Sequence, residues 1–354
     1  MRLNGNFSAA KEVKDNIRQL APDAPESYAF NLNTLVTELS WEESQTRFDA
    51  ELVADAEKLI QLCTDSPTID NADYYCGHAH FTLSYFNGIR GNYIRAGRHG
   101  TTAIDYLEAA LEKNPQQIRA KMYLGVAYYY ADHLPQFIKL FSRVLWFIPS
   151  GNSAKSLPYL REVMDSGDSF SDVARYIYAT LLVNGTPEEI KDALSEIDIL
   201  IKRYPANARF QLRYVSVMIG DKRYAETLDR INTYLASDYA ASLSKIDVNL
   251  LNIWAARAQL GLGQVEQAVR LQKQIKFDPS NTTVPSWGLA WYELTNGQLA
   301  DLTGNRKAAI ASYEKILALD KVTFVNPTII ELANAAIVAP YTLPGRSLTQ
   351  EPVL

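Results

Sequence analysis

The sequence is poor in the residues and motifs that build catalytic and nucleic-acid-binding sites. It contains 4 histidines and 2 cysteines in 354 residues. It has no Gly-x-Ser-x-Gly motif and no phosphate loop ending in Gly-Lys. The segment from Gly261 to Gly263 lacks the third glycine and the preceding strand of a dinucleotide-binding loop. The net charge is −5, whereas nucleic-acid-binding proteins carry a basic excess. We therefore predict a protein that is not an enzyme and has no cofactor and no nucleic-acid partner.

Long hydrophobic runs are also missing. No apolar run approaches the ~18 residues that a membrane-spanning helix needs, so we expect no transmembrane span. The first residues, MRLNGNFSAA, lack the apolar segment of a signal peptide. Hydrophobic residues make up 47% of the chain, and because they are spread over many short segments they can form a continuous core.

The two cysteines are candidates for a disulfide. Cys63 ends one predicted helix and Cys76 lies in the first turns of the next, across a loop of about a dozen residues. Antiparallel neighbours joined in this way could bring the sulfurs within bonding distance. Two buried thiols that pack as small hydrophobic groups are the alternative. A disulfide would indicate an oxidising compartment, such as the bacterial periplasm.

A zinc site is a further interpretation of this region. Cys76 and His80 share a helix face at i, i+4, whereas His78 points elsewhere. Cys63 or His99 could complete a four-ligand zinc site. No Cys-x-x-Cys pair or His-Glu-x-x-His signature accompanies these residues. We therefore expect structural histidines in an aromatic-rich helix and no metal.

Residues 118–149, IRAKMYLGVAYYYADHLPQFIKLFSRVLWFIP, have the spacing of a helix-turn-helix repeat of about 34 residues. Leu124 and Gly125 occupy its Leu-Gly positions, Tyr128 and Phe141 its aromatic positions, and Pro149 its closing position. Gly125 would let the two helices approach closely, the aromatic rings would fill the space between them, and the proline would end the second helix. This stretch resembles the tetratricopeptide repeat (TPR) family.

Weaker copies of the pattern cover about two thirds of the chain. The resemblance, which extends in overall order to bacterial TPR-containing proteins, implies an all-α fold: a right-handed, TPR-like helical solenoid of stacked antiparallel helix pairs. We expect helices over residues 8–20, 26–39, 42–63, 72–96, 153–165 and 327–338. The predicted segments are residues 1–71, N-terminal helices with a partial TPR; 72–149, two TPR units; 150–173, an inserted helix; 174–237 and 238–321, two TPR-like units each; and 322–354, a C-terminal capping helix and a loose tail.

The start of the chain has the spacing of the end of a repeat. Gly5, Ala10, Ile17 and Pro22 match the turn, the second helix and the closing proline. Either the chain begins in mid-repeat and an upstream segment, such as an export signal, was removed, or residues 8–20 form a capping first helix. With the two cysteines, the first interpretation favours the periplasm or cell envelope of a bacterium; the cytoplasm is the alternative.

The resemblance implies a protein–protein interaction scaffold or adaptor that holds a protein or peptide in the concave face of the solenoid. By the family's spacing, the groove residues are Tyr85, Asn92, Arg95, Arg119, Met122, Tyr129, Arg175, Tyr178, Phe210 and Tyr214. Arginine forks with tyrosine rings suit an acidic or extended peptide; a solvated face with ordinary stacking tyrosines is the alternative. Gly88, Tyr123 and Ala179 depart from the family's carboxylate clamp, so we predict no clamp.

A self-associating structural component of a bacterial envelope assembly is the second functional hypothesis. Residues 327–338, PTIIELANAAIV, are too apolar for a solvated capping helix. We expect this helix to pack on the last repeat, and its remaining apolar surface to favour a homo-oligomer.

Overall fold

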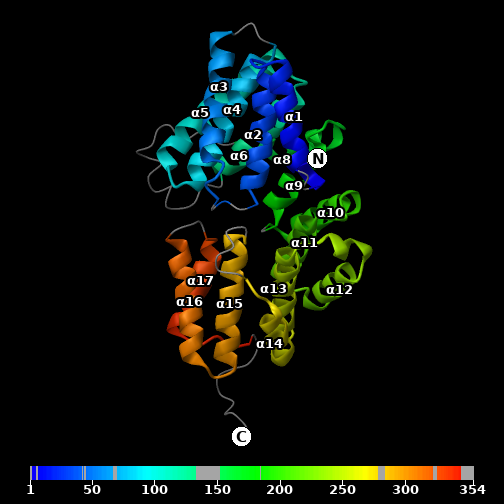
Figure 1. Cartoon of the computed structure of the whole chain (residues 1–354), viewed down its shortest axis with the longest axis vertical. Helices are drawn as coiled ribbons and strands as arrows, with labels where there is room; N and C mark the ends of the chain where they lie inside the picture. The colour runs from blue at the N-terminus through cyan, green and yellow to red at the C-terminus, as the bar shows by residue number, and fades with distance from the viewer. Residues whose placement is uncertain are drawn as a thin grey trace. The chain divides into compact units, whose positions relative to one another are not determined.

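The computed structural model describes residues 2–4, 7–41, 43, 45–66, 70–132, 152–183, 185–277, 284–321 and 325–343. Within these residues the chain forms sixteen α-helices, two short 3-10 helices and no strand (Figure 1). The chain divides into two compact units. The first comprises Met1–Ser40 and Thr46–Leu200, and the second comprises Trp41–Gln45 and Ile201–Leu354. The prediction of an all-α fold is confirmed.

The helices of the first unit pack in sequence order. They are η1 (Arg2–Asn4), α1 (Phe7–Leu20), α2 (Pro25–Leu39), α3 (Asp49–Asp65), α4 (Ala72–Ile89), α5 (Tyr93–Lys113), α6 (Ile118–Asp132), α8 (Ser153–Asp165), α9 (Ser171–Leu182) and α10 (Pro187–Arg203). From α1 to α6 each helix contacts the next one, and α4 also contacts α2 and α6; α6 packs on α8, and α8 packs on α9.

The second unit repeats one helix pair. Its helices are α11 (Ala208–Gly220), α12 (Tyr224–Leu235), η2 (Asp238–Ser242), α13 (Lys245–Gly261), α14 (Val265–Gln274), α15 (Ser286–Leu302), α16 (Arg306–Asp320) and α17 (Pro327–Val338). Each first helix packs on its own partner and on the next first helix, so that α11, α13, α15 and α17 follow one another. Contacts restricted to sequence neighbours are typical of a helical solenoid.

Four helix pairs share the same connecting turn. The pairs α4–α5, α11–α12, α13–α14 and α15–α16 each contain one residue with a left-handed backbone: Gly91, Lys222, Gly263 or Gly304, with φ between 59° and 78°. In each turn the N–H of the next residue donates to the carbonyl five residues earlier, at 2.8 to 2.9 Å. This is the Schellman arrangement, which satisfies carbonyls at a helix C-terminus. The turns therefore end the first helix and reverse the chain in the same way each time.

The spacing of these turns differs from the predicted repeat. In the second unit they begin at Met218, Gln259 and Ala300 and recur roughly every 41 residues, whereas the sequence pattern was read with a period of about 34. Between α12 and α13 the connection contains η2, which lengthens this repeat. The six predicted segments remain a prediction. The boundary between the two units lies after Leu200, inside α10, and a boundary inside a continuous helix was not predicted from the sequence.

Glycine allows close helix contacts at Gly125, which the pattern singled out, and at Gly297 in the second unit. A Cβ atom at Gly125 would lie 2.9 Å from Leu160 Cγ, and one at Gly297 would lie 2.7 Å from Tyr313 Cδ1. The close approach expected at Gly125 therefore occurs, but its partner is α8. The helix α8, which we expected to be an insertion, packs against α6, and its status as an insertion remains a prediction. Phe141, the second helix of that predicted repeat and its closing proline lie outside the described residues.

Two predicted helix boundaries were wrong. The helix expected at residues 72–96 ends at Ile89, because Gly91 adopts a left-handed conformation that reverses the chain. Asn92 and Arg95 consequently lie in the turn and at the start of α5, not on a first helix. The helix expected at residues 42–63 begins only at Asp49. By contrast, α8 and α17 have the predicted bounds.

Candidate binding surfaces

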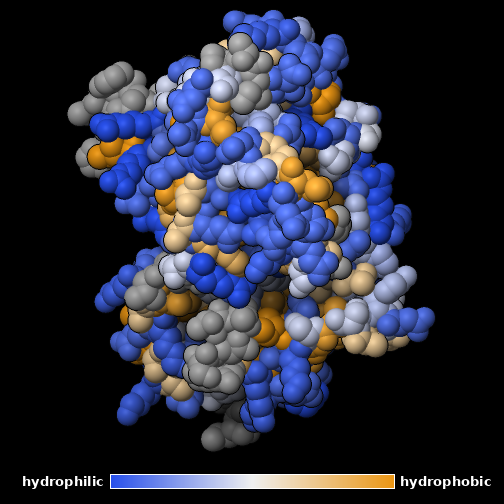
Figure 2. All heavy atoms as spheres, turned by 45° about the horizontal axis from the view of Figure 1, so that its top comes forward, coloured by the Kyte–Doolittle hydropathy of each residue, from blue (hydrophilic) through white to orange (hydrophobic). Residues whose placement is uncertain are grey.

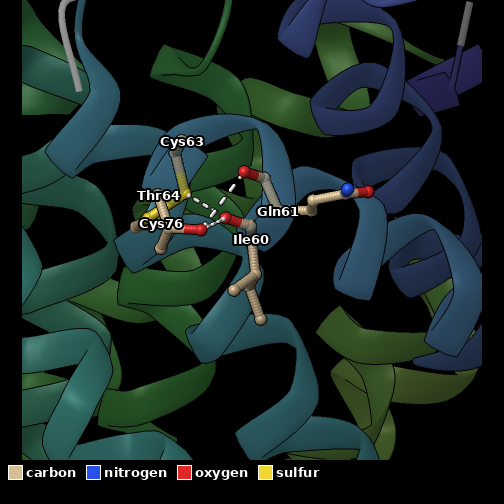
Figure 3. Close-up of a disulfide and its surroundings, with 5 residues drawn as sticks. All are labelled: Ile60, Gln61, Cys63, Thr64 and Cys76. Carbon is tan, nitrogen blue, oxygen red and sulfur yellow. Dashed lines mark hydrogen bonds between the residues drawn. A yellow bond between two sulfur atoms is a disulfide. The ribbon is translucent and has the colours of Figure 1, made fainter. Parts of the chain in front are cut away.

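A disulfide joins α3 to α4 (Figure 3). Cys63 near the end of α3 is bonded to Cys76 in α4, with their Cα atoms 5.8 Å apart. Both residues are buried, and the Thr64 hydroxyl donates to the Ile60 carbonyl at 2.8 Å in the same turn. Because Cys76 is bonded, it is not available as a metal ligand, and the zinc interpretation of this region loses its thiolate.

The neighbouring His78 belongs to an aromatic core in the first unit. Its ring stacks on Tyr123 at 4.7 Å and on Tyr74 at 6.0 Å between centroids, and the residue is buried. The Tyr123 hydroxyl donates to Asn33 Oδ1 at 2.7 Å. These contacts agree with the expectation of a structural histidine in an aromatic-rich helix.

Four of the ten predicted groove residues are interior. Met122, Arg175, Tyr178 and Phe210 are each at most 8% exposed. The Arg175 guanidinium pairs with Glu196 and lies 3.7 Å from Asp172. The Tyr178 hydroxyl donates to Asp192 at 2.6 Å, and burial raises its pKa above the usual value. These four were wrongly placed on a partner-binding face, because the family's spacing does not show that α6, α9 and α11 are covered by other helices.

The other six predicted residues are at least partly exposed. Asn92 and Arg95 flank the α4–α5 turn, and Tyr85 is half-buried in α4. The Arg119 guanidinium lies 5.2 Å from the centre of the Phe170 ring and 3.8 Å from Asp168 Oδ2. The Tyr129 hydroxyl donates to the Leu181 carbonyl at 2.9 Å, and the Arg230 guanidinium covers the Tyr214 ring at 3.7 Å. Arg119, Tyr129 and Tyr214 thus already have partners in their own units, which favours ordinary stacking.

A groove that the sequence analysis missed lies in the second unit, between α12 and α14 with α13 beneath. Its volume is about 280 Å³, and its lining residues are Leu228, Ile231, Asn232, Leu235, Asn252, Ala255, Gln259, Gln267, Arg270, Leu271 and Gln274. We call it the α12–α14 groove. Ile231 and Ala255 are buried, Leu228, Leu235 and Leu271 are half-buried, and Asn232, Arg270 and Gln274 are exposed.

The polar lining of this groove is almost entirely carboxamide. Five of the lining residues are asparagine or glutamine, and Arg270 is the one charged residue in the lining. The Oε1 atoms of Gln259 and Gln267 are enclosed and have no hydrogen-bond partner among the described residues. A carboxamide can both donate and accept, so these two side chains retain unused hydrogen-bonding capacity beside an apolar strip.

A second hollow, of about 450 Å³, lies between α11 and α12 and is strongly charged. Its Arg223 donates to Glu226 at 3.0 Å, and its Arg230 donates to Gln211 at 3.1 Å while covering Tyr214. Both arginines therefore have partners within the protein. This hollow is larger than the α12–α14 groove, but its cations are already engaged, so we regard the groove as the better binding surface.

Elsewhere in the second unit, Arg257 is an enclosed cation without a carboxylate partner among the described residues. Its guanidinium lies 4.2 Å from the centre of the Trp291 ring, and Nη1 makes only long contacts of 3.4 Å to Thr295 and Gln298. Burial lowers the pKa of Arg257 to about 10.

Hydrophilic residues cover most of the face visible in Figure 2, with hydrophobic residues in smaller areas between them.

Comparison with solved structures shows the kind of fold. A crystal structure of a tetratricopeptide repeat protein from Parabacteroides merdae matches over 85% of this chain and 97% of its own length, with a TM-score of 0.50 and 13% sequence identity. The chain has a TPR-like fold. The predicted resemblance is confirmed at the level of structure. No family model matches the sequence, and no curated protein matches it.

Among the described residues, no three or more His, Cys, Asp and Glu side chains are placed to hold a metal together. No helix in the same part of the chain is long and apolar enough to cross a membrane. The sequence shows only which groove residues share a helix face: Asn252 and Gln259 on one helix, and Gln267 and Gln274 on the next, are each spaced by seven residues.

Proposed function

We propose that this protein is a non-enzymatic interaction scaffold whose second unit holds an extended segment of a partner protein in the α12–α14 groove. The observation that carries the proposal is an apolar strip bordered by five carboxamides, two of which have unpaired oxygens. This groove lies beside second helices of the TPR-like pairs. It replaces the first-helix surface predicted from the sequence, because part of that surface is interior.

An extended peptide suits this lining better than a compact small molecule. Every peptide unit offers one N–H donor and one C=O acceptor, and a carboxamide can serve either. Side chains on one side of the segment would pack on Leu228, Leu235 and Leu271, since these are only half-buried. Main-chain hydrogen bonds then supply affinity and the apolar contacts supply specificity.

The charge of the groove indicates the composition of the segment. Arg270 is exposed at the rim, and no carboxylate is present in the lining. A carboxylate on the partner can therefore pair with Arg270 without a competing acid. We infer a mainly uncharged segment with an acidic residue near this arginine, in keeping with the acidic partner expected from the sequence.

Site-specific photo-cross-linking tests the proposal. Benzoylphenylalanine is introduced at Asn232 and at Gln274, which are exposed on the two sides of the groove, and at Lys273, an exposed control residue on α14 that does not line it. In lysate of the source cells, the two groove positions should cross-link to the same partner segment and the control should not. Equal cross-linking from Lys273 would contradict a groove-specific site.

An oxidising compartment is the proposed location, namely the periplasm or cell envelope of a bacterium, because a disulfide joins Cys63 and Cys76 and such bonds persist mainly outside the cytosol. Rapid acid quenching of cells followed by alkylation of free thiols measures the fraction oxidised. Full alkylation of both cysteines would favour the cytoplasm.

Self-association through α17 is a second candidate function. Ile329, Ala333 and Ala336 pack on the preceding helices, while Leu332 is 40% and Val338 86% exposed. An exposed apolar helix face at the end of a stack can bury further surface in an oligomer. If so, light scattering should show a concentration-dependent mass that Val338→Asp returns to the monomer value; a monomer at every concentration would dismiss this function.

A further inference from the structure

Two histidines on neighbouring helices face each other in the first unit. His80 lies in α4 and His99 in α5, and their Nδ1 atoms are 2.9 Å apart. The ring centroids are 5.1 Å apart, and both side chains are only partly buried, so solvent reaches the pair. The site is therefore a juxtaposition of two imidazole nitrogens at the surface of a helix hairpin.

The turn of the hairpin that carries the pair, and its first helix α4, are each fixed by a bond. The α4–α5 turn is closed by the bond from the Asn92 N–H to the Asn87 carbonyl at 2.8 Å. At the other end, the disulfide at Cys76 fixes α4 one turn before His80. The Tyr106 ring stacks on His80 at 5.9 Å with an interplanar angle of 11°. The hydrogen bond between the two rings brings the nitrogens together before any ligand arrives.

Burial favours the neutral form of both histidines. Burial, and secondarily the charge of His99, lowers the pKa of His80 to about 4. Burial, followed by the charge of Arg95, lowers the pKa of His99 below its usual value. In the metal-free protein one Nδ1–H donates to the other Nδ1. A neutral imidazole is also the form that binds a metal ion.

We propose that His80 and His99 form a two-imidazole chelate for a divalent ion that prefers square geometry, Cu²⁺ or Ni²⁺. On binding, both Nδ1 lone pairs are donated to the metal. The ring that donated the hydrogen bond gives up its Nδ1 proton to water and takes one up on Nε2, while the other ring already carries its proton on Nε2, so no net proton is released. The remaining metal positions would be filled by water or by donors from another molecule. This site is independent of the α12–α14 groove.

The choice of ion rests on the ligands, because imidazole suits Cu²⁺ and Ni²⁺, and Cu²⁺ binds such ligands most tightly among the first-row divalent ions. The 2.9 Å separation is that of the hydrogen bond in the metal-free pair, and a chelate needs little change from it. Two metal–nitrogen bonds of about 2.0 Å at a right angle place the nitrogens about 2.8 Å apart, close to the separation found here. The tetrahedral angle preferred by Zn²⁺ would place them about 3.3 Å apart. A zinc ion would therefore need the two nitrogens to move slightly apart, which rotation of the two rings can supply.

Arg95 is the cation that acts on His99, and its positive charge opposes a divalent ion at the pair. This gives a variant that should strengthen binding. Arg95→Gln removes the charge without touching either ligand, and it should tighten Cu²⁺ binding several-fold, most clearly at low salt. Arg98→Gln, a similar change at an exposed position on the same helix, is the matched control and should have a smaller effect.

The test is titration of the metal-free full-length chain with Cu²⁺, Ni²⁺ and Zn²⁺ by calorimetry, with electron paramagnetic resonance of the copper form. We expect one high-affinity Cu²⁺ per chain, a spectrum showing two coordinated nitrogens, and Ni²⁺ bound more tightly than Zn²⁺. His80→Gln and His99→Gln should each weaken Cu²⁺ binding at least tenfold, with helical circular dichroism confirming that each variant is folded. Unchanged binding in the double variant, a single coordinated nitrogen, or Zn²⁺ bound more tightly than Ni²⁺ would overturn the proposal.

Discussion

Reduction of the Cys63–Cys76 disulfide is expected to destabilise the first unit and to leave the second unit unchanged. The bond has a sequence separation of 13, and the entropy of closing a loop of that length corresponds to about 3 kcal/mol of stabilisation. Both cysteines are buried, and a buried thiol packs as a small hydrophobic group, so the released thiols should add little cost. A loss of about 3 kcal/mol corresponds to a roughly 100-fold increase in the population of the opened state.

Hydrogen exchange followed by mass spectrometry measures this change in each unit separately. After reduction, the protected amides of α3 and α4 should exchange faster, by up to roughly 100-fold where exchange requires opening of the unit. The amides of α13 and α15 provide the internal control, because these helices belong to the second unit. A Cys63→Ala, Cys76→Ala double variant should reproduce the change without a reductant.

Two results would refute this reasoning. Equal protection of the α4 amides in oxidised and reduced protein would mean that the disulfide contributes nothing to the stability of its hairpin. An equal loss of protection in α13 would mean that the bond does not act on the first unit alone.

Three further predictions concern packing and charge. Gly297→Ala should destabilise the second unit by about 1–3 kcal/mol in urea unfolding, because its Cβ would overlap the fully buried Tyr313 ring, whereas Gly88→Ala, with nothing within 4 Å, should not. Arg257→Met should raise the melting temperature by calorimetry, since it removes an enclosed charge that has no carboxylate partner among the described residues; a lower value would indicate that the cation is needed. Burial raises the pKa of Glu51, but its hydrogen bonds outweigh this and hold it below its usual value, so this stabilisation, present above about pH 4.5, should be lost as the pH falls through the lowered pKa. Glu51→Gln should flatten the loss in acid unfolding curves.

The helix pairs and their close contacts were predictable because local chemistry determines them. Pro327 begins α17 at the predicted residue, since a proline is tolerated in the first turn of a helix. The glycine at 297 permits the approach of Tyr313 that a TPR-like pair requires. By contrast, the left-handed backbone of Gly91 forms a turn inside the helix expected at residues 72–96, and this turn places Asn92 and Arg95 off the first helix.

The binding surface was less predictable, because exposure depends on which helices cover which faces. Arg175 has the spacing of a groove arginine, yet it is enclosed with Glu196 and Asp172. The α12–α14 groove arises where two second helices lie apart above α13, and such a separation has no signature in one sequence. The seven-residue spacing of its carboxamides indicates only that they share a helix face, as solvated residues also do.

The central claim is that the α12–α14 groove binds an extended segment of a partner. The segment identified by cross-linking is synthesised as a fluorescent peptide, and its affinity is measured by anisotropy for the native chain and for Asn232→Arg, Gln274→Arg and Lys273→Glu. All three substituted residues are exposed, so folding should be preserved. We predict that the two groove variants bind about tenfold or more weakly, a loss of at least ~1.4 kcal/mol, and that Lys273→Glu binds like the native chain. Equal affinity in all four proteins would contradict the claim.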